Sequence, residues 1–210
     1  MVLKNWFKGL KHSLSTHKYK LLMSLIFLSA AVAIYAISGD FVSDHNWSAV
    51  SDVILNNIGP YNLSFIFVWL LVLVVVVFIA YPLIYQTDKL PYAITILSFF
   101  LVIRSVFMLF THLGAPIDAI KVNAPSLLQF LTFTNDLFFS GHTGLPFLGY
   151  LIFRKDNKWI KTFMFISSII MAITVLLMHI HYSIDVLAAF FITYGIYKIG
   201  DSWIKSWGSK

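Results

Sequence analysis

Six runs of apolar residues, separated by short polar segments, form the main pattern along the chain. A helix that crosses a bilayer needs about 20 apolar residues, since each residue rises ~1.5 Å. The runs cover residues 21–38, 63–85, 92 to about 113, about 138–153, 160–178 and 184–199. The fourth and sixth runs are short, so polar motifs that open them should lie at the membrane edge. The pattern predicts an all-α, polytopic membrane protein with six transmembrane helices.

The overall composition agrees with a chain whose solvent is the bilayer. Hydrophobic residues make up 59% of the 210 residues, charged residues 11%, and the mean hydropathy is +0.83. Soluble domains carry far more charge than this. We therefore expect a single membrane domain over residues 1–210. It would consist of a basic N-terminal segment at 1–20, a six-helix bundle at about 21–199 and a tail at 200–210.

The net charge of +6 indicates topology rather than nucleic-acid binding, because the basic residues lie between apolar runs. They cluster before residue 21 and in the segments after runs two, four and six, whereas the segments after runs one and three are mainly acidic. The positive-inside rule then predicts that both termini are cytoplasmic. A composition rich in Ile, Phe and Lys is typical of an AT-rich bacterial genome. We therefore expect the protein in a bacterial inner membrane. A cleaved signal peptide is an alternative interpretation of the first run.

The absence of two residue types limits the catalytic and metal-binding groups that the chain can supply. The chain has no cysteine and no glutamate, so thiolate metal sites and cysteine nucleophiles are excluded. Any carboxylate that orients a base or caps a helix must be one of nine aspartates. The sequence offers no pattern typical of a cation site, and we expect neither a metal nor a cofactor.

The first motif that could carry chemistry opens the fourth run and contains Asp136 followed by Ser140-Gly141-His142-Thr143. Ser140 is a typical helix N-cap, and Gly141 lets the backbone approach a ligand. The free N–H groups at the start of a helix favour phosphate binding. We therefore predict that His142 lies beside a bound anion. For Asp136, capping and a direct role in the site both stay open.

The second motif, His179-Ile-His181-Tyr182-Ser-Ile-Asp185, opens the sixth run. In a helix, His181 and Asp185 are neighbours at i and i+4, so the carboxylate can accept one imidazole N–H and leave the other nitrogen free. This arrangement predicts an oriented nucleophile or base. His179 and Tyr182 are secondary candidates, and simple hydration at the membrane surface is the alternative for His179.

One arginine, Arg104, lies inside the third run, where an unpaired charge costs about 2.5 to 3.5 kcal/mol. It should therefore face a polar interior, with a substrate phosphate, Asp136 or Asp185 as its partner. On a helix it shares a stripe with Met108 and His112. His112 is thus a further secondary candidate, with surface hydration as the alternative.

These residues resemble the motifs of the type 2 phosphatidic acid phosphatase (PAP2) superfamily, and more closely those of its sphingomyelin synthase branch. The branch pattern is Asp-x-x-x-Ser-Gly-His-Thr followed by His-Tyr-Thr/Ser-x-Asp-Val, which Asp136, residues 140–143 and residues 181–186 match. The hydrolase branch carries a Lys-x6-Arg-Pro motif and a Ser-Arg pair. Here Lys89 has no such arginine partner and Thr174-Val175 replaces the pair. These departures favour the head-group transferase branch.

The resemblance implies a phospholipid head-group phosphotransferase with its site on the extracytoplasmic side. His181, oriented by Asp185, would attack the phosphodiester to form a phosphohistidine, and His142 would serve as acid and then base. The expected phosphate-binding residues are Arg104, Ser140, Gly141 and Thr143. The acceptor would be a ceramide- or diacylglycerol-like lipid alcohol, or water.

Two other functions remain open at this stage. With water as acceptor, the same residues would make a lipid phosphate phosphatase or a phospholipase C-like hydrolase. A non-catalytic lipid-binding or transport protein could also keep the fold. The sequence predicts membrane and phospholipid as partners and excludes nucleic acid, but it does not predict the oligomeric state.

Overall fold

The computed structural model describes residues 16–45, 47–122 and 136–208, and within these ranges it is all-helical, with no strand. This confirms the all-α part of the prediction. The α-helices are α2 (Lys18–Ser43), α3 (Ser64–Tyr85), α4 (Leu90–Phe110), α5 (Gly141–Phe153), α6 (Lys158–Leu177) and α7 (Ser183–Gly208), with 3₁₀ turns η1 (Leu55–Asn57) and η2 (Thr87–Lys89). Most of the predicted basic segment 1–20 lies outside the described residues.

Five of the described helices, α2, α3, α4, α6 and α7, are long and apolar enough to cross a membrane, which indicates a multi-pass membrane protein. Helix α5 is the exception, since its 13 residues extend only ~20 Å. The fourth apolar run begins at about residue 138, whereas the helix itself begins at Gly141, directly after the predicted N-cap Ser140. Phe139 ahead of it has a φ of 43°, a left-handed conformation that a right-handed helix cannot contain.

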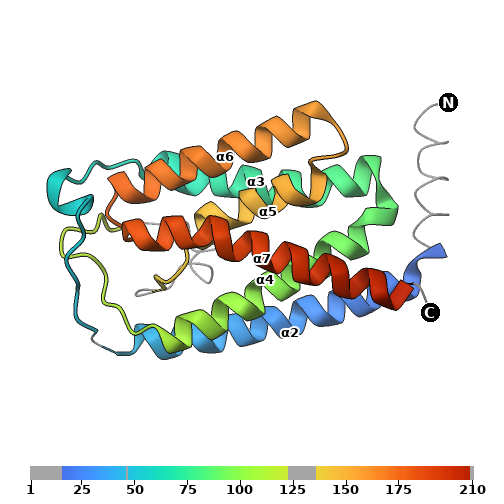
Figure 1. The fold of residues 1–210 in the computed structure, drawn as a ribbon, viewed down its shortest axis with the longest axis horizontal. Helices are drawn as coiled ribbons and strands as arrows, with labels where there is room; N and C mark the ends of the chain where they lie inside the picture. The colour runs from blue at the N-terminus through green and yellow to red at the C-terminus, as the bar shows by residue number, and fades with distance from the viewer. Residues whose placement is uncertain (1–15, 46, 123–135, 209–210) are drawn as a thin grey trace.

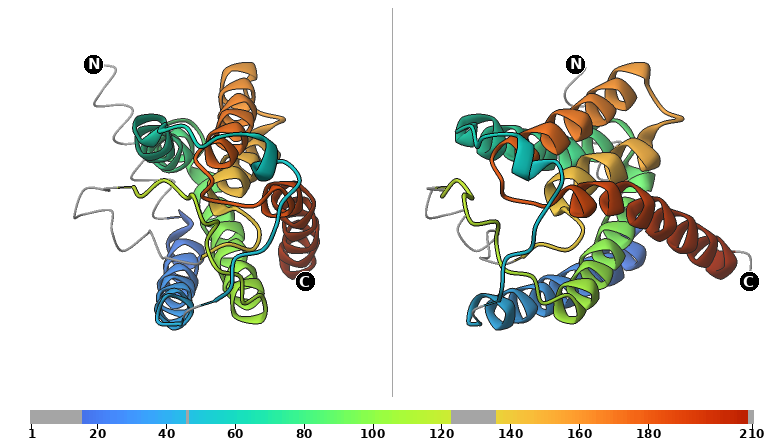
Figure 2. Two further views of the ribbon diagram at one scale, coloured as in Figure 1. Left: turned by 90° about the vertical axis from the view of Figure 1, so that its left-hand side faces the viewer. Right: turned by 60° about the vertical axis from the view of Figure 1, so that its left-hand side comes forward.

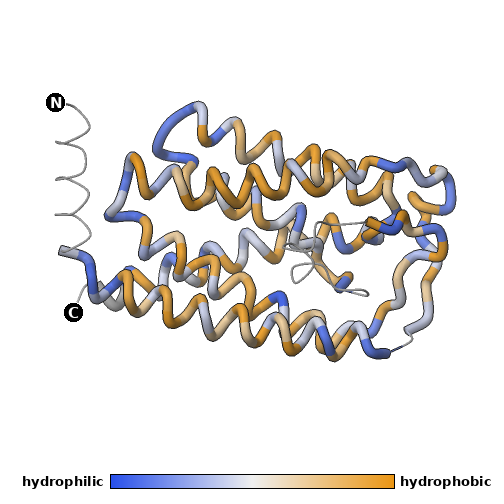
Figure 3. Tube along the Cα trace, turned by 180° about the vertical axis from the view of Figure 1, so that it is seen from behind, coloured by the Kyte–Doolittle hydropathy of each residue, from blue (hydrophilic) through white to orange (hydrophobic). Residues whose placement is uncertain are grey.

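Successive helices run in alternating directions, so the connections gather at two opposite ends of the molecule (Figure 1). Helix α7 packs against α5 and α4, and the end-on view shows it at one side of the bundle (Figure 2). The end-on view shows α5 near the centre of the bundle (Figure 2). Hydrophobic residues cover the middle of the helices and hydrophilic residues mark both ends (Figure 3).

The main core forms where α5 packs against α3, α6 and α7. Its buried side chains include Phe78 of α3, Leu148 of α5 and Met164 of α6. Gly149 allows this close approach, because a Cβ there would lie 2.7 Å from the Met164 sulfur and 3.2 Å from the Phe78 ring. This packing fixes the start of α5 deep among the other helices.

The end of the bundle opposite the α6–α7 turn carries the basic connections. There Lys89, the last residue of η2, forms an ion pair with Asp156 in the turn between α5 and α6. Helix α7 reaches the same end and continues to Gly208. Most of the segment that was expected to form a separate tail, 200–210, is therefore the last part of this helix.

Candidate active site

The turn between α6 and α7 places His181 against Asp185. His179 adopts a left-handed φ of 54°, which reverses the chain after α6. His181 Nδ1 donates to Asp185 Oδ2 at 3.4 Å, and the Tyr182 backbone N–H donates to the same oxygen at 2.9 Å. His181 precedes α7, so the contact is made from the turn and not within a helix as the sequence suggested. Both side chains are buried.

The start of α5 brings His142 to the same place. Ser140 caps the helix as expected, because its Oγ accepts a hydrogen bond from the Thr143 N–H at 3.4 Å. The Ser140 N–H donates to the Asp185 carbonyl oxygen at 3.1 Å, which ties α5 directly to α7. The ring centroids of His142 and His181 lie 6.1 Å apart. The structure thus brings the two motifs together at one location.

The imidazole of His142 is held by ring stacking. Both of its nitrogens are buried and have no hydrogen-bond partner in the described part of the chain. One face lies against Phe67 of α3, with a centroid distance of 4.2 Å and an interplanar angle of 29°. No pattern in the sequence marks Phe67, because a phenylalanine within an apolar span is ordinary core. Its contact fixes one face of the ring and takes up neither nitrogen.

Arg104 of α4 is buried next to the two imidazoles, and it forms an ion pair with Asp136. Arg104 Nη1 donates to Asp136 Oδ1 at 2.6 Å. Tyr35 of α2 donates its hydroxyl proton to the other carboxylate oxygen, also at 2.6 Å. The guanidinium carbon lies 5.7 Å from the ring centroids of both Tyr35 and Phe139. Sequence reasoning found Arg104 and Asp136 but missed Tyr35, which looks like one more apolar aromatic residue in the first run.

The first residue of α5 touches the guanidinium. A Cβ added to Gly141 would lie 2.6 Å from Arg104 Nε, a distance that requires one of them to move. The helix N-terminus, Arg104 and His142 therefore border one small region. A helix start and a guanidinium both favour anions, so the region suits a phosphoryl group.

Thr143 lies on the interior side of α5. Its side chain is fully buried, and Oγ1 has no hydrogen-bond partner among the described residues. Its backbone carbonyl accepts a hydrogen bond from Ser168 Oγ of α6 at 3.1 Å. Its N–H, bonded to Ser140, is the part of Thr143 that belongs to the helix start.

Two secondary candidates, both in the α6–α7 turn, bind other connections at the same end of the bundle. Tyr182 donates its hydroxyl proton to the Gly114 carbonyl at 2.8 Å and accepts a hydrogen bond from the Val50 N–H at 3.1 Å. His179 Nε2 is hydrogen-bonded to the Ile58 carbonyl at 2.9 Å. These contacts fasten the α2–α3 connection and the segment after α4 onto the turn that carries His181.

His112 lies apart from the other imidazoles. Its ring is exposed and stacks on Trp47 at 4.1 Å with an angle of 8°. The helical stripe that linked it to Arg104 does not reach it, because α4 ends at Phe110 and Thr111 is extended. No group of three or more histidines and aspartates within the described ranges is arranged to hold a metal ion.

Comparison with known proteins identifies the segment that carries this site. Residues 134–202 match the model of a family described as PAP2 superfamily C-terminal. The matched segment contains α5, α6, most of α7 and both histidine motifs, and over these residues the chain is similar to the PAP2 superfamily. Members of that superfamily are generally phosphatases or phosphotransferases, which indicates lipid chemistry of that type. No curated protein and no solved structure matches the chain.

Proposed function

We propose that this protein is a phospholipid head-group phosphotransferase of the sphingomyelin synthase kind. It moves a phosphocholine- or phosphoethanolamine-type group from a glycerophospholipid to a lipid alcohol. The observation that carries this proposal is the pair of imidazoles, His142 and His181, whose rings lie 6.1 Å apart with one of them held by Asp185. A nucleophile and a general acid that serve one phosphorus atom must both reach it, and this separation allows that.

In the first step, His181 Nε2 attacks the phosphorus of the donor lipid. Its other nitrogen, Nδ1, keeps its proton in the hydrogen bond to Asp185. The bond from phosphorus to the diacylglycerol oxygen breaks, and His142 gives that oxygen a proton. The products are diacylglycerol and a phosphohistidine that still carries the head group. The approaching phosphate favours the protonated form of His142 that this step needs.

In the second step, the hydroxyl of the acceptor attacks the phosphohistidine. His142, now neutral, takes the proton from that hydroxyl, and the bond between phosphorus and His181 breaks. The head group leaves on the acceptor, and both imidazoles return to their starting states. Asp185 stabilises the positive charge that His181 acquires during attack, as a carboxylate does for a catalytic histidine.

Arg104 and the start of α5 stabilise the phosphoryl oxygens as charge moves between them. The guanidinium is already held by Asp136, which is itself bonded to Tyr35, so its position does not depend on the substrate. A donor that is fixed before reaction costs no reorganisation during it. This site has fewer basic residues than the hydrolase motifs supply. That number suits a substrate whose phosphate remains a diester.

We further propose six membrane crossings, with α5 and residues 136–140 together forming the fourth. Both termini lie in the cytoplasm of a bacterial cell, and the site faces the outer side of the inner membrane. Support comes from the alternating helix directions (Figure 1) and from the basic residues in the connections opposite the α6–α7 turn, such as Lys89.

The function is tested with the full chain in vesicles that contain phosphatidylcholine or phosphatidylethanolamine with a labelled head group. Addition of a ceramide or diacylglycerol acceptor should yield a new labelled lipid. His181→Ala and His142→Ala should abolish this product, whereas His45→Ala, which changes an exposed imidazole of the outer surface, should not. Soluble phosphocholine or phosphoethanolamine as the sole product would make the protein a hydrolase. Unchanged product formation by His181→Ala would end the proposal.

A further inference from the structure

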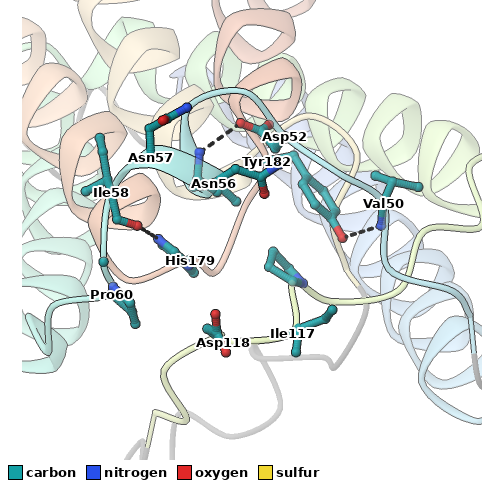
Figure 4. Close-up of a pocket in the computed structure, with 13 residues that line it drawn as sticks. Val50, Asp52, Asn56, Asn57, Ile58, Pro60, Ile117, Asp118, His179 and Tyr182 are labelled. Carbon is teal, nitrogen blue, oxygen red and sulfur yellow. Dashed lines mark hydrogen bonds between the residues drawn. The ribbon is translucent and has the colours of Figure 1, made fainter.

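A cavity of about 570 Å³ lies on the outer side of the α6–α7 turn. Residues from three separate segments line it: the α2–α3 connection, the segment after α4, and the turn itself. Figure 4 shows the side chains of Asp118, His179 and Tyr182 around this opening. The hydrogen bonds from His179 and Tyr182 to the two outer segments hold its walls together.

The charged side chains that line this cavity are carboxylates. They belong to Asp52 and Asp118, and the lining includes no lysine or arginine. Both carboxylate oxygens of Asp52 already accept hydrogen bonds. The donors are the Ser183 N–H and hydroxyl and two backbone N–H groups of the loop that contains Asp52. Asp118 has no hydrogen bond or ion pair with any side chain that the structure describes. Its charge is therefore available to a ligand, and that ligand should be cationic.

The cavity adjoins the reacting pair through two of its own wall residues. His179 and Tyr182 are within two residues of His181 in the chain, and the Tyr182 N–H binds the carboxylate that orients His181. In a choline or ethanolamine head group, a two-carbon linker separates the ammonium from the phosphate. A phosphate at His181 must therefore place its ammonium close by.

We propose that this cavity binds the ammonium group of the phospholipid head group, with Asp118 as its charge partner. The proposal rests on the proposed function and specifies its substrate class as lipids with a cationic head group. Lipids whose head group is an uncharged polyol, such as phosphatidylglycerol, lack the charge that this cavity recognises. Asp118 is thus a residue that determines specificity, because it contacts a part of the substrate away from the reacting atoms.

The first test measures kcat/KM of the reconstituted chain for phosphatidylethanolamine and for phosphatidylglycerol. Asp118→Asn should lower the ratio of the two values about fivefold, the upper end for a partly solvated ion pair. Asp44→Asn, a charge change at an exposed aspartate outside the cavity, should leave the ratio unchanged. An unchanged ratio in Asp118→Asn would overturn the proposal.

The second test does not depend on turnover. The chain has no cysteine, so Asn56→Cys places a single fluorophore on the cavity wall, in a His181→Ala background. Choline should change the fluorescence, glycerol should not, and Asp118→Asn should weaken the choline response. An equal response to glycerol, or none to choline, contradicts the ammonium site. The chain with His181 intact could lack lipid turnover while the labelled His181→Ala chain still responds to choline. That pair of results would contradict only the proposed function.

Discussion

At the scale of single residues, the position of His142 depends on Phe67. The imidazole has no hydrogen bond within the described chain, so ring stacking is what limits its rotation. His142 must reach the leaving oxygen as an acid and the entering oxygen as a base, so its ring needs a fixed orientation. A misplacement of about 1 Å can cost 100-fold in rate.

Replacing Phe67 by alanine should therefore lower kcat by about 10- to 100-fold with little change in KM. Phe67→Tyr keeps the ring and should retain most of the activity. Phe65→Ala is the matched control, since Phe65 lies on the same helix but is 75% exposed. Head-group transfer in vesicles gives the rates. Wild-type turnover by Phe67→Ala would show that stacking does not position His142.

The sequence identified the polar members of the site and missed the aromatic ones for a physical reason. Histidine, aspartate and arginine are costly in a membrane, so their presence in an apolar run already indicates a site. Phe67 and Tyr35 cost nothing there, and only the packing of α3 and α2 reveals their contacts. His112 was misplaced because the end of α4 at Phe110 is not visible in an apolar run that continues to Leu113.

At the scale of elements, the site depends on how closely α5 approaches α4. Gly141→Ala would place a Cβ against Arg104 Nε and push the guanidinium away from the phosphoryl position. We expect a loss of about tenfold or more in kcat/KM. Gly195→Ala on α7 is the control, because a Cβ there meets no atom within 4 Å. Equal activities of the two variants would contradict this role of the helix contact.

The start of α7 is held by Asp52, whose carboxylate accepts hydrogen bonds from the N–H and hydroxyl of Ser183. Burial alone would raise the pKa of Asp52, but these bonds and those from its own loop outweigh it and lower the pKa below the ordinary 3.8. A lowered pKa in the folded state gives stability above the unfolded pKa, near 3.9. That stability is lost as pH falls through the folded value.

Asp52→Asn should remove this acid-sensitive part of the stability. Its melting temperature should be lower than wild type at neutral pH, by an amount that corresponds to about 1 kcal/mol, and the difference should shrink below pH ~4. Thermal unfolding in detergent at a series of pH values measures this. Asp44→Asn serves as the control, and a difference that stays constant down to low pH would contradict the assignment.

The helices themselves were largely predictable, because apolar length determines them in a bilayer. The start of α5 was predictable from its N-cap Ser140, but the left-handed backbone at Phe139 was not, since Phe138 and Phe139 continue the apolar pattern. The extension of α7 through residue 208 was missed, because its final turns carry polar residues that resemble a tail.

At the scale of the whole molecule, the two ends of the bundle should face opposite sides of the membrane. The cysteine-free chain allows single cysteines at Val53, in the α2–α3 connection, and at Lys155, in the α5–α6 turn, both exposed. An impermeant maleimide added to intact cells should label Val53→Cys, and Lys155→Cys only after lysis. Labelling of both in intact cells would contradict the six-crossing topology.

The central claim is that His181 carries the head group between two half-reactions at one phosphorus atom. The most direct measurement mixes the protein with lipid labelled in its head group, without acceptor, and maps the bound label by mass spectrometry after rapid quenching. We expect an acid-labile, base-stable adduct on His181 that disappears when a lipid alcohol is added. Rapid transfer with no adduct, or a label on another residue, would contradict it.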